Sequence, residues 1–185
     1  MRVIAGALKS RAIRAPKGNA TRPTSDRVRE SLFSVIGDVH GVVVRDLYAG
    51  SGALAIEAIS RGAARAVCVE SSRAALASIA ENVAALGLQE RVKIVARKVE
   101  ASAASLRPFA RFSLVFADPP YADVAEGSVA EALASIVDPE ASLLDEGALV
   151  VVEHAARDAP PKIEGLTPEE TRRWGDTAAT FYRAR

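Results

Sequence analysis

The chain has 185 residues, of which 49% are hydrophobic and 25% charged, with a net charge of +1. This length and composition predict one globular domain that can bury a core. The apolar runs are too short to span a bilayer, and no signal-peptide core follows Met1. A single cysteine excludes an internal disulfide and a cysteine metal cluster. We therefore expect a cytoplasmic protein without a metal or a membrane partner.

Positive charge is concentrated at the N-terminus. Residues 1–30 contain eight basic and two acidic residues, a net charge of +6, which leaves −5 for the rest of the chain. Such a distribution predicts a polyanionic partner bound by this segment, and a solvated arm without a function is the alternative. Apolar residues interrupt the charges and Lys17-Gly18-Asn19 supplies a turn, which favours a short hairpin. We assign residues 1–25 to a basic extension and 26–185 to the main domain.

The periodicity of apolar residues predicts an alternation of strands and helices. A helix capped by Thr24 or Ser25 runs to Ile36. Strands follow over 42–47, 66–70, 92–96, 112–117 and 148–153, and helices over 52–61, 72–86, 99–107 and 127–137. This alternation predicts an α/β fold with a doubly wound, mostly parallel sheet. Two weaker strands, near 162–167 and 177–183, predict an antiparallel hairpin at its edge.

The most informative stretch, Asp118-Pro119-Pro120-Tyr121, follows the apolar strand 112–117. Two prolines make the turn stiff and remove two N–H donors. The residues before them are held extended, so the carbonyls of Asp118 and Pro119 point outward. A carboxylate and a carbonyl can accept from an exocyclic NH₂ group while the tyrosine ring stacks on the heterocycle. A rigid loop without chemistry is the alternative interpretation.

A second candidate site follows the strand that ends near Asp46. A glycine turn and a helix come next, which is the arrangement that binds nucleotide-like ligands. The residues expected to contact such a ligand are Asp46, Tyr48, Ala49, Gly50, Ser51 and Gly52. The dinucleotide spacing is absent because Ala55 occupies the position of the third glycine, and no Gly-Lys-Ser/Thr follows. An acid beside a turn with two glycines suits S-adenosylmethionine, whose ammonium and sulfonium are cationic.

The next strand ends in Glu70, 18 positions after Gly52. An acid near this offset binds the ribose hydroxyls of a nucleoside, and we expect Ser71 to line the same site. The three signals occur in order, each at the carboxyl end of a strand. Ligands of open α/β sheets bind at that edge, so the signals support one another.

Five segments together resemble the RsmD family of bacterial methyltransferases, which act on the N2 amino group of a guanine in 16S ribosomal RNA. They are Arg22–Phe33, Asp46–Leu54, Ser60–Ala63, Asp118–Tyr121 and Trp174–Thr177. The resemblance spans nearly the whole chain. It implies a Rossmann-like methyltransferase fold over 26–185, S-adenosylmethionine as cofactor, and ribosomal RNA within a partly or fully assembled small subunit as partner. We expect a monomer.

The resemblance extends the list of site residues. Asp118, Pro119, Pro120 and Tyr121 are expected to act in catalysis, and Thr24 to contact the cofactor. The RNA-binding candidates are Arg2, Lys9, Arg11, Arg14, Arg22 and Arg27. Arg22 and Arg27, with Arg29, have a second interpretation as contacts of the cofactor or target base. Arg97-Lys98 departs from the family, which often has an acid there against the adenine, so no acid is assigned to that contact.

Several alternatives remain at this point. A DNA or other RNA amino-methyltransferase would share the Asp-Pro-Pro-Tyr turn, as would an enzyme acting on a metabolite or a protein amide. A non-catalytic RNA-binding assembly factor would not need Asp118, Gly50 and Gly52 intact. Among the remaining polar residues, we expect Glu57 and Arg61 to form a surface ion pair and Glu81-Asn82 to lie on a solvated helix face. Trp174 suits either RNA stacking or the core.

Overall fold

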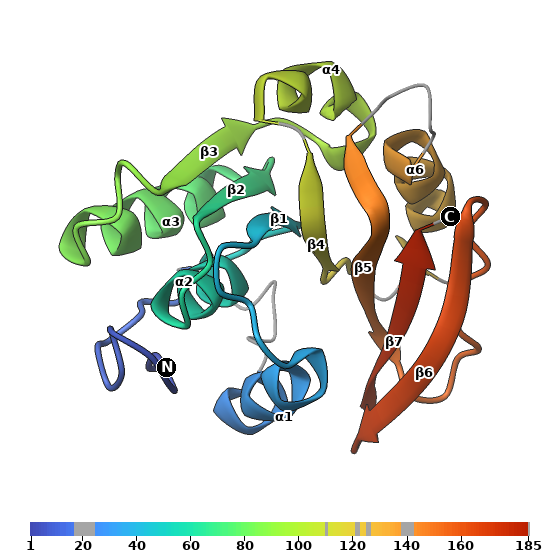
Figure 1. Cartoon of the computed structure of the whole chain (residues 1–185), viewed down its shortest axis with the longest axis horizontal. Helices are drawn as coiled ribbons and strands as arrows, with labels where there is room; N and C mark the ends of the chain where they lie inside the picture. The colour runs from blue at the N-terminus through green and yellow to red at the C-terminus, as the bar shows by residue number, and fades with distance from the viewer. Residues whose placement is uncertain (17–24, 110, 121–122, 125–126, 138–142, 185) are drawn as a thin grey trace.

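The computed structural model of the chain describes residues 1–16, 25–109, 111–120, 123–124, 127–137 and 143–184. These residues form a seven-stranded sheet in the order β3-β2-β1-β4-β5-β7-β6 (Figure 1). The strands are β1 Val43–Leu47, β2 Arg65–Glu70, β3 Val92–Ala96, β4 Phe112–Ala117, β5 Leu144–Ala155, β6 Leu166–Trp174 and β7 Thr177–Ala184. The helices are α1 Asp26–Ile36, α2 Ala53–Ser60, α3 Arg73–Ala85, η1 Val99–Ala101, α4 Ala103–Leu106, η2 Arg107–Phe109 and α6 Ser128–Val137.

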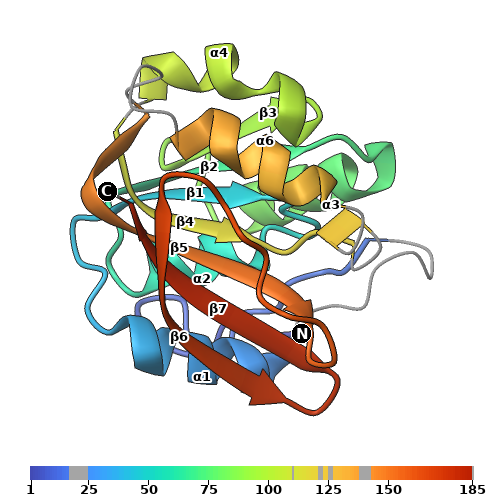
Figure 2. The same ribbon diagram turned by 90° about the vertical axis from the view of Figure 1, so that its right-hand side faces the viewer.

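The first five strands run parallel to one another, and β7 runs antiparallel to both β5 and β6. The predicted doubly wound sheet with an antiparallel edge hairpin is therefore confirmed. Helices cover both faces of the sheet, with α1 and α2 on one side and α4 and α6 on the other (Figure 2). The buried apolar residues form two clusters, one on each face of the sheet. One cluster lies under α1, α2 and α3, and the other lies under α4 and α6. No described helix is long and apolar enough to cross a membrane.

The largest differences from the expected elements lie in the last third of the chain. β6 starts at Leu166 rather than near 162, and β5 is longer at both ends than the predicted strand 148–153. β6 is an edge strand with many exposed polar residues, so it lacks the apolar pattern that marks a strand. Its Pro168 is tolerated there because β6 pairs on one side only and the register shifts after that residue. The predicted helix over 99–107 is divided into η1, α4 and the beginning of η2.

The N-terminal hairpin, residues 1–16, packs against the main domain. Arg2 pairs with Ala12 in an antiparallel bridge, and the Val3 N–H donates to Arg11 O at 2.9 Å. Val3 and Ile13 are buried in the cluster under α1, α2 and α3. Gly6 has a φ of 81°, and a Cβ at this position would lie 1.8 Å from the carbonyl oxygen of Ser60. Only glycine therefore allows the hairpin to approach the end of α2 this closely.

Glu57 of α2 binds this hairpin through hydrogen bonds. Its side chain is fully buried, which contradicts the prediction that it forms an ion pair at the surface. Its carboxylate accepts from the backbone N–H groups of Ile4 at 2.8 Å and Ala5 at 3.0 Å, and from Arg61 Nε at 2.7 Å. The Glu57–Arg61 pair exists as predicted, but Glu57 lies in the core, where it also pairs with Arg29 Nε of α1 at 3.7 Å and so joins three chain segments. Only the tertiary fold supplies the two backbone donors.

Arg45 is a buried cation in the middle of β1. Its guanidinium lies 4.2 Å from the centre of the Phe112 ring, and no described residue accepts a hydrogen bond from its three nitrogens. Burial lowers the pKa of Arg45 to about 9. The favourable interaction that the described residues provide is a cation–π contact on the face covered by α4 and α6.

The buried carboxylate of Glu57 generates a stability prediction. Glu57→Ala removes the acceptor of two backbone N–H groups and the partner of Arg61, and breaking a buried pair in this way costs about 3–5 kcal/mol. We expect urea unfolding to show a loss of this size in the free energy of unfolding. Glu81→Ala is the matched control, because the Glu81–Arg14 pair is exposed and such pairs contribute about 0–1 kcal/mol. Equal losses in the two variants would contradict the anchoring role of Glu57.

Candidate active site at the carboxyl edge of the sheet

The chain turns sharply where β1 ends. Tyr48 has a φ of 57°, a left-handed conformation that is strained for a residue with a large side chain. The glycine turn follows, and Gly52 occupies the N-cap of α2 with a φ of 75°. Glycine has no side chain to cap the helix. Asp46 of β1 takes this role instead, since its Oδ2 accepts from the Ala55 N–H at 3.1 Å.

Asp46 lies in a strongly negative environment. Burial raises the pKa of Asp46 well above its usual range. The hydrogen bond from Ala55 opposes this rise in the pKa, whereas the nearby carboxylates of Asp118 and Glu70 add to it. Three acids from β1, β2 and β4 therefore lie close enough to influence one another. A ligand that carries positive charge would relieve this repulsion.

Glu70 connects two loops of the site. Its Oε2 accepts from the Gly50 N–H at 2.9 Å, and its Oε1 accepts from the N–H groups of Ser71 at 2.7 Å and Ser72 at 2.8 Å. Ser72 in turn caps α3. These three bonds leave acceptor capacity on the carboxylate, which has about four lone-pair sites. The glycine turn and the start of α3 are thus held around one side chain.

Asp118 follows β4 directly beside the end of β1. Leu47 pairs with Ala117 in the sheet, and the Asp118 N–H donates to Leu47 O at 3.4 Å. The two prolines continue the turn, with Pro119 buried and Pro120 exposed. Tyr121 lies outside the described residues. The described part of the turn therefore stands next to Tyr48 and the glycine turn.

One cavity of about 780 Å³ joins these elements. Ten of the sequence-predicted residues line it, namely Asp46, Tyr48, Ala49, Gly50, Ser51, Glu70, Ser71, Asp118, Pro119 and Pro120. Gly52 does not line the cavity, because it forms the N-cap behind the turn. Thr24 lies outside the described residues. A volume of this size is in the range of small-molecule sites, about 300–1,000 Å³.

Sequence reasoning missed several lining residues. Glu100 of η1 lines the cavity close to Arg97 and Lys98, so an acid is present near the position where none was assigned. Glu153 of β5 and Trp174 of β6 line it as well. Glu153 was detectable as a polar residue late in the apolar strand, at the same edge as Asp118. Trp174 packs against the core, as one of its two interpretations predicted, and donates from Nε1 to Ser31 Oγ at 3.0 Å; its stacking on RNA stays a prediction.

The N-terminal hairpin also reaches this cavity. Met1 and Pro16 line it, and Ser51 of the glycine turn contacts the Met1 sulfur at 3.7 Å. The two ends of the hairpin therefore contribute to the wall of the site. No feature of the sequence marks this contact, because it depends on how the hairpin folds over α2 and α3.

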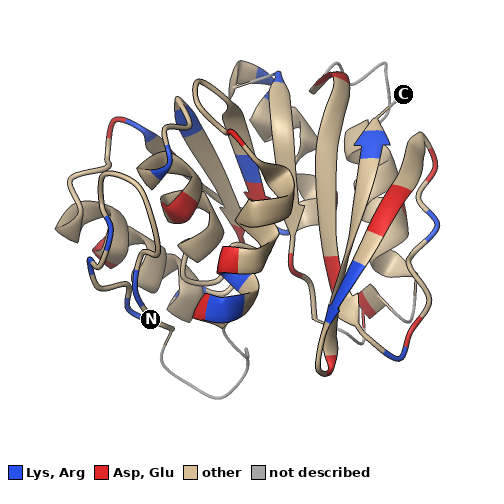
Figure 3. Cartoon of the chain, turned by 60° about the horizontal axis from the view of Figure 1, so that its bottom comes forward, with Lys and Arg blue, Asp and Glu red and all other residues tan. Residues whose placement is uncertain are grey.

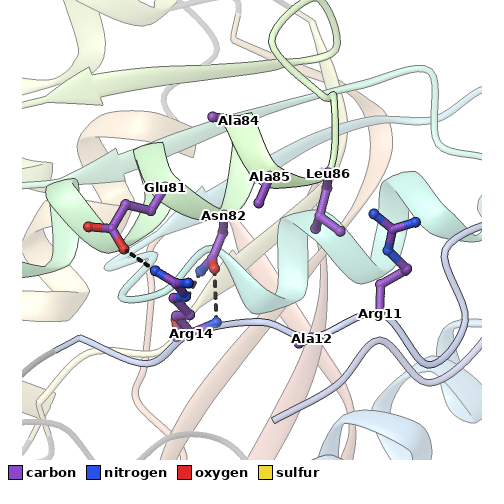
Figure 4. A pocket seen from close by; sticks show the side chains of 8 residues that line it. All are labelled: Arg11, Ala12, Arg14, Glu81, Asn82, Ala84, Ala85 and Leu86. Atoms are coloured by element: carbon purple, nitrogen blue, oxygen red, sulfur yellow. Dashed lines mark hydrogen bonds and ion pairs between the residues drawn. The ribbon is translucent and has the colours of Figure 1, made fainter.

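Asn82 of α3 links the hairpin to the glycine turn, whereas it was expected on a solvated face. It is buried, and its Oδ1 accepts from the Arg14 N–H at 2.8 Å (Figure 4). Its Nδ2 donates to Arg14 O at 2.9 Å and to Ser51 O at 3.0 Å. Glu81 remains exposed as predicted and pairs with the Arg14 side chain at 3.3 Å. The predicted solvated position was therefore wrong for Asn82 and right for Glu81, because the hairpin covers one side of α3.

The described basic candidates do not line the cavity. The five described ones, Arg2, Lys9, Arg11, Arg14 and Arg27, are exposed, and Arg22 lies outside the described residues. Basic positions recur along the N-terminal hairpin (Figure 3). Arg11 and Arg14 border a groove of about 460 Å³ between the hairpin and α3 (Figure 4). In the described ranges no group of three or more His, Cys, Asp or Glu residues could hold a metal ion.

Comparison with known proteins places the chain in a family. The family model "Conserved hypothetical protein 95" matches residues 1–183. "Putative rRNA methyltransferase YlbH" of Bacillus subtilis is 35% identical over 190 residues and covers 100% of both chains. "Ribosomal RNA small subunit methyltransferase D" of Escherichia coli K12 is 33% identical over 166 residues, covering 88% of this chain and 79% of its own. The chain belongs to the RsmD family.

Solved structures agree with this assignment. The putative methyltransferase yhhF from Escherichia coli superimposes with a TM-score of 0.81 at 29% identity, over 100% of this chain and 98% of that chain. An RNA methyltransferase from Salinibacter ruber, in complex with S-adenosyl-L-homocysteine, has a TM-score of 0.65 over 88% of this chain and 94% of its own. At 20% identity this second likeness concerns the fold alone. The predicted methyltransferase fold is thereby confirmed.

The contacts of Glu70 generate a binding prediction. We expect Glu70→Ala to weaken binding of S-adenosylmethionine, the cofactor predicted from the sequence, by about 1–3 kcal/mol. The variant loses the expected acceptor of the ribose hydroxyls and the three bonds that hold the two loops. Titration calorimetry on the purified variant measures the change. Glu90→Ala, an exposed acid that does not line the cavity, is the control. An unchanged affinity in Glu70→Ala would mean that its carboxylate serves the loops alone.

Proposed function

We propose that the chain transfers a methyl group from S-adenosylmethionine to the exocyclic N2 amino group of a guanine in 16S ribosomal RNA. Membership of the RsmD family supports the general activity, methylation of ribosomal RNA. The finer assignment depends on one observation: Asp118-Pro119-Pro120, the glycine turn and Glu70 border a single cavity. An amino-group acceptor and a cofactor site therefore share one chamber. Such an enzyme works where ribosomes are assembled, in the cytoplasm.

The residues of the cavity fit the proposed cofactor. Asp46 and Glu70 give the cofactor side of the cavity a negative character that matches an ammonium and a sulfonium. Glu70 keeps acceptor capacity for ribose hydroxyls at the end of β2. Glu100 and the Arg97-Lys98 pair border the end of the cavity beside β3, where we expect the adenine. When bound, S-adenosylmethionine supplies an electrophilic methyl group.

The protein's task is to make the amino nitrogen nucleophilic. The lone pair of an aryl amine is delocalised into the ring, which keeps the nitrogen flat. Hydrogen bonds from its two protons to the Asp118 carboxylate and the Pro119 carbonyl favour a pyramidal nitrogen whose lone pair is available for attack. Asp118 also stabilises the positive charge that develops on this nitrogen. No base has to remove a proton before transfer.

The target base has to leave its stack to enter the cavity, at a cost of a few kcal/mol. The stiff Pro119-Pro120 turn keeps the acceptors in place during this exchange, and positioning of this kind accounts for a large part of the rate enhancement. Tyr121 is expected to stack on the flipped base. The recognition surface of a chain this small is limited, which favours an assembled or partly assembled small subunit as the substrate.

Mapping of the product tests the proposed function. Small-subunit RNA and whole small subunits, both from cells that lack this gene, are incubated separately with the protein and labelled S-adenosylmethionine. Digestion to nucleosides followed by mass spectrometry identifies the modified base. We expect N2-methylguanosine at one position, with subunits as the better substrate. Label only in ribosomal protein, or methyl groups only on another base, would contradict the proposal.

Asp118 provides a test of the mechanism. Asp118→Ala should bind S-adenosylmethionine normally but lower the transfer rate by about a hundredfold or more, close to 3 kcal/mol, as for other losses of a pre-organised polar group. Asp118→Asn keeps one acceptor oxygen without the charge, so we expect an intermediate rate. Single-turnover kinetics measure both variants. Near-normal transfer by Asp118→Ala would remove this residue from the mechanism.

The N-terminal hairpin provides a test of RNA binding. Neutralising Arg2, Lys9, Arg11 and Arg14 together should weaken subunit or RNA binding and flatten its salt dependence, because each lost phosphate contact reduces the slope by about 0.7–0.9. Cofactor affinity should not change, since these four side chains are exposed and Asn82 holds the backbone of Arg14, not its side chain.

A matched control uses four basic residues near the amino ends of β2, β3 and β4, on the side of the sheet opposite the cavity. Arg65, Lys93, Arg107 and Arg111 are equally exposed, carry the same total charge and do not line the cavity. Their neutralisation should leave the salt slope close to that of the wild type. If both quadruple variants bind alike, the hairpin is not the RNA anchor, and the exposed Arg172 and Arg173 of β6 become the next candidates.

A further inference from the structure

Glu153 lies next to the turn that is proposed to hold the amino group. β5 runs parallel to β4 in a register that pairs Ala117 with Val152. The next residues are Asp118, which directly follows the end of β4, and Glu153, which lies on β5; neighbouring strands of a sheet are about 4.8 Å apart. Both residues line the same cavity, and Glu153 is only 8% exposed. A second carboxylate therefore stands beside the first at the edge where the base is expected.

The two carboxylates also share one face of the sheet. Phe116 and Val151 belong to the cluster under α1, α2 and α3, whereas Ala117 and Val152 belong to the cluster under α4 and α6. Because side chains alternate along a strand, Asp118 and Glu153 fall on the α1 side. The indole of Trp174 lines the cavity on this side and is held by its hydrogen bond to Ser31. These residues stand on the side of the cavity formed by β4, β5 and β6, away from β3.

Bases that carry an amino group differ at the neighbouring ring nitrogen. In guanine that atom is N1–H, a donor. In adenine and cytosine the corresponding nitrogen is an unprotonated acceptor. An Asp-Pro-Pro turn binds any of these amino groups, so it cannot select among them by itself. A carboxylate placed beside the turn accepts from guanine N1–H and repels the lone pair of the other two bases.

We propose that Glu153 selects guanine by accepting the hydrogen bond from N1–H. This inference rests on the proposed function, since it supplies the base specificity of the same site. Glu153 acts as a specificity residue that touches the Watson–Crick edge, which is the edge that enzymes read on a flipped base. It takes no part in the transfer itself.

2-Aminopurine provides the discriminating substrate. It carries the same 2-amino group as guanine, but its N1 is an unprotonated acceptor. Once the target position is mapped, small subunits are reconstituted with guanine or 2-aminopurine at that position. The measured quantity is the ratio of kcat/KM for guanine to that for 2-aminopurine. We expect wild-type protein to prefer guanine by about tenfold to a hundredfold, the usual discrimination from a matched edge contact.

The variants are chosen to separate selection from folding. Glu153→Gln presents an amide that can donate to N1 of 2-aminopurine, so the ratio should fall to about one or below. Glu153→Ala removes both the acceptor for N1–H and the repulsion of an unprotonated N1, so it should lower the ratio at least fivefold; it also decides the question if the glutamine variant does not fold. Glu146→Gln is the control, because Glu146 is an exposed carboxylate of the same strand that does not line the cavity.

A wild-type ratio in Glu153→Gln, with or without an equal loss on both substrates, would overturn the inference and mean that this carboxylate is structural. Affinity for S-adenosylmethionine, measured in parallel, should be unchanged in all variants, and a selective loss there would assign Glu153 to the cofactor. If wild-type protein forms no N2-methylguanosine on the guanine substrate, the proposed function fails and this inference fails with it.

Discussion

The whole site depends on the position of Leu47 at the end of β1, the middle one of the five parallel strands. Leu47 pairs with Val69 of β2 on one side and with Ala117 of β4 on the other. Because these pairings are parallel, the residues that follow on the two neighbours, Glu70 and Asp118, arrive at the same edge as Tyr48 and the glycine turn. A shift of one residue in either pairing would turn these carboxylates to the other face of the sheet. The chemistry therefore depends on the register of β1.

The acids at this edge hold the loops in shape as well as lining the cavity. Asp46 caps α2, and Glu70 accepts from Gly50 and from the two residues that begin the α3 segment. The loops that would contact a cofactor are thus organised by side chains before any ligand arrives. Pre-organisation of this kind lowers the entropy cost of binding. A substitution of Asp46 or Glu70 therefore changes the loop structure and any ligand contact at the same time. A conservative variant, which keeps part of the hydrogen bonding to the loops, separates these two effects better than alanine does.

The N-terminal hairpin belongs to the site more closely than its charge indicates. Glu57 accepts hydrogen bonds from the first half of the hairpin, and Asn82 is hydrogen-bonded to its second half. Met1 and Pro16 line the cavity. Asn82 contacts both Arg14 and Ser51, so one buried amide connects the basic surface with the glycine turn. Binding of RNA to the hairpin and of cofactor to the turn would therefore involve neighbouring parts of one rigid structure.

The sequence by itself determined the alternation of strands and helices, the three polar segments at strand ends and the family to which the chain belongs. These are local features: apolar periodicity, glycine and proline positions and the order of short motifs. The tertiary structure alone decided the partners of Glu57 and Asn82 and the positions of Glu100 and Glu153 in the cavity wall, and it placed the nine-residue β6 over Leu166–Trp174 rather than from near 162. The physical reason is that a buried polar side chain is explained by its hydrogen-bond partners. The hairpin partners of Glu57 and Asn82 lie more than 50 residues away in the sequence, and sequence spacing carries no information about them.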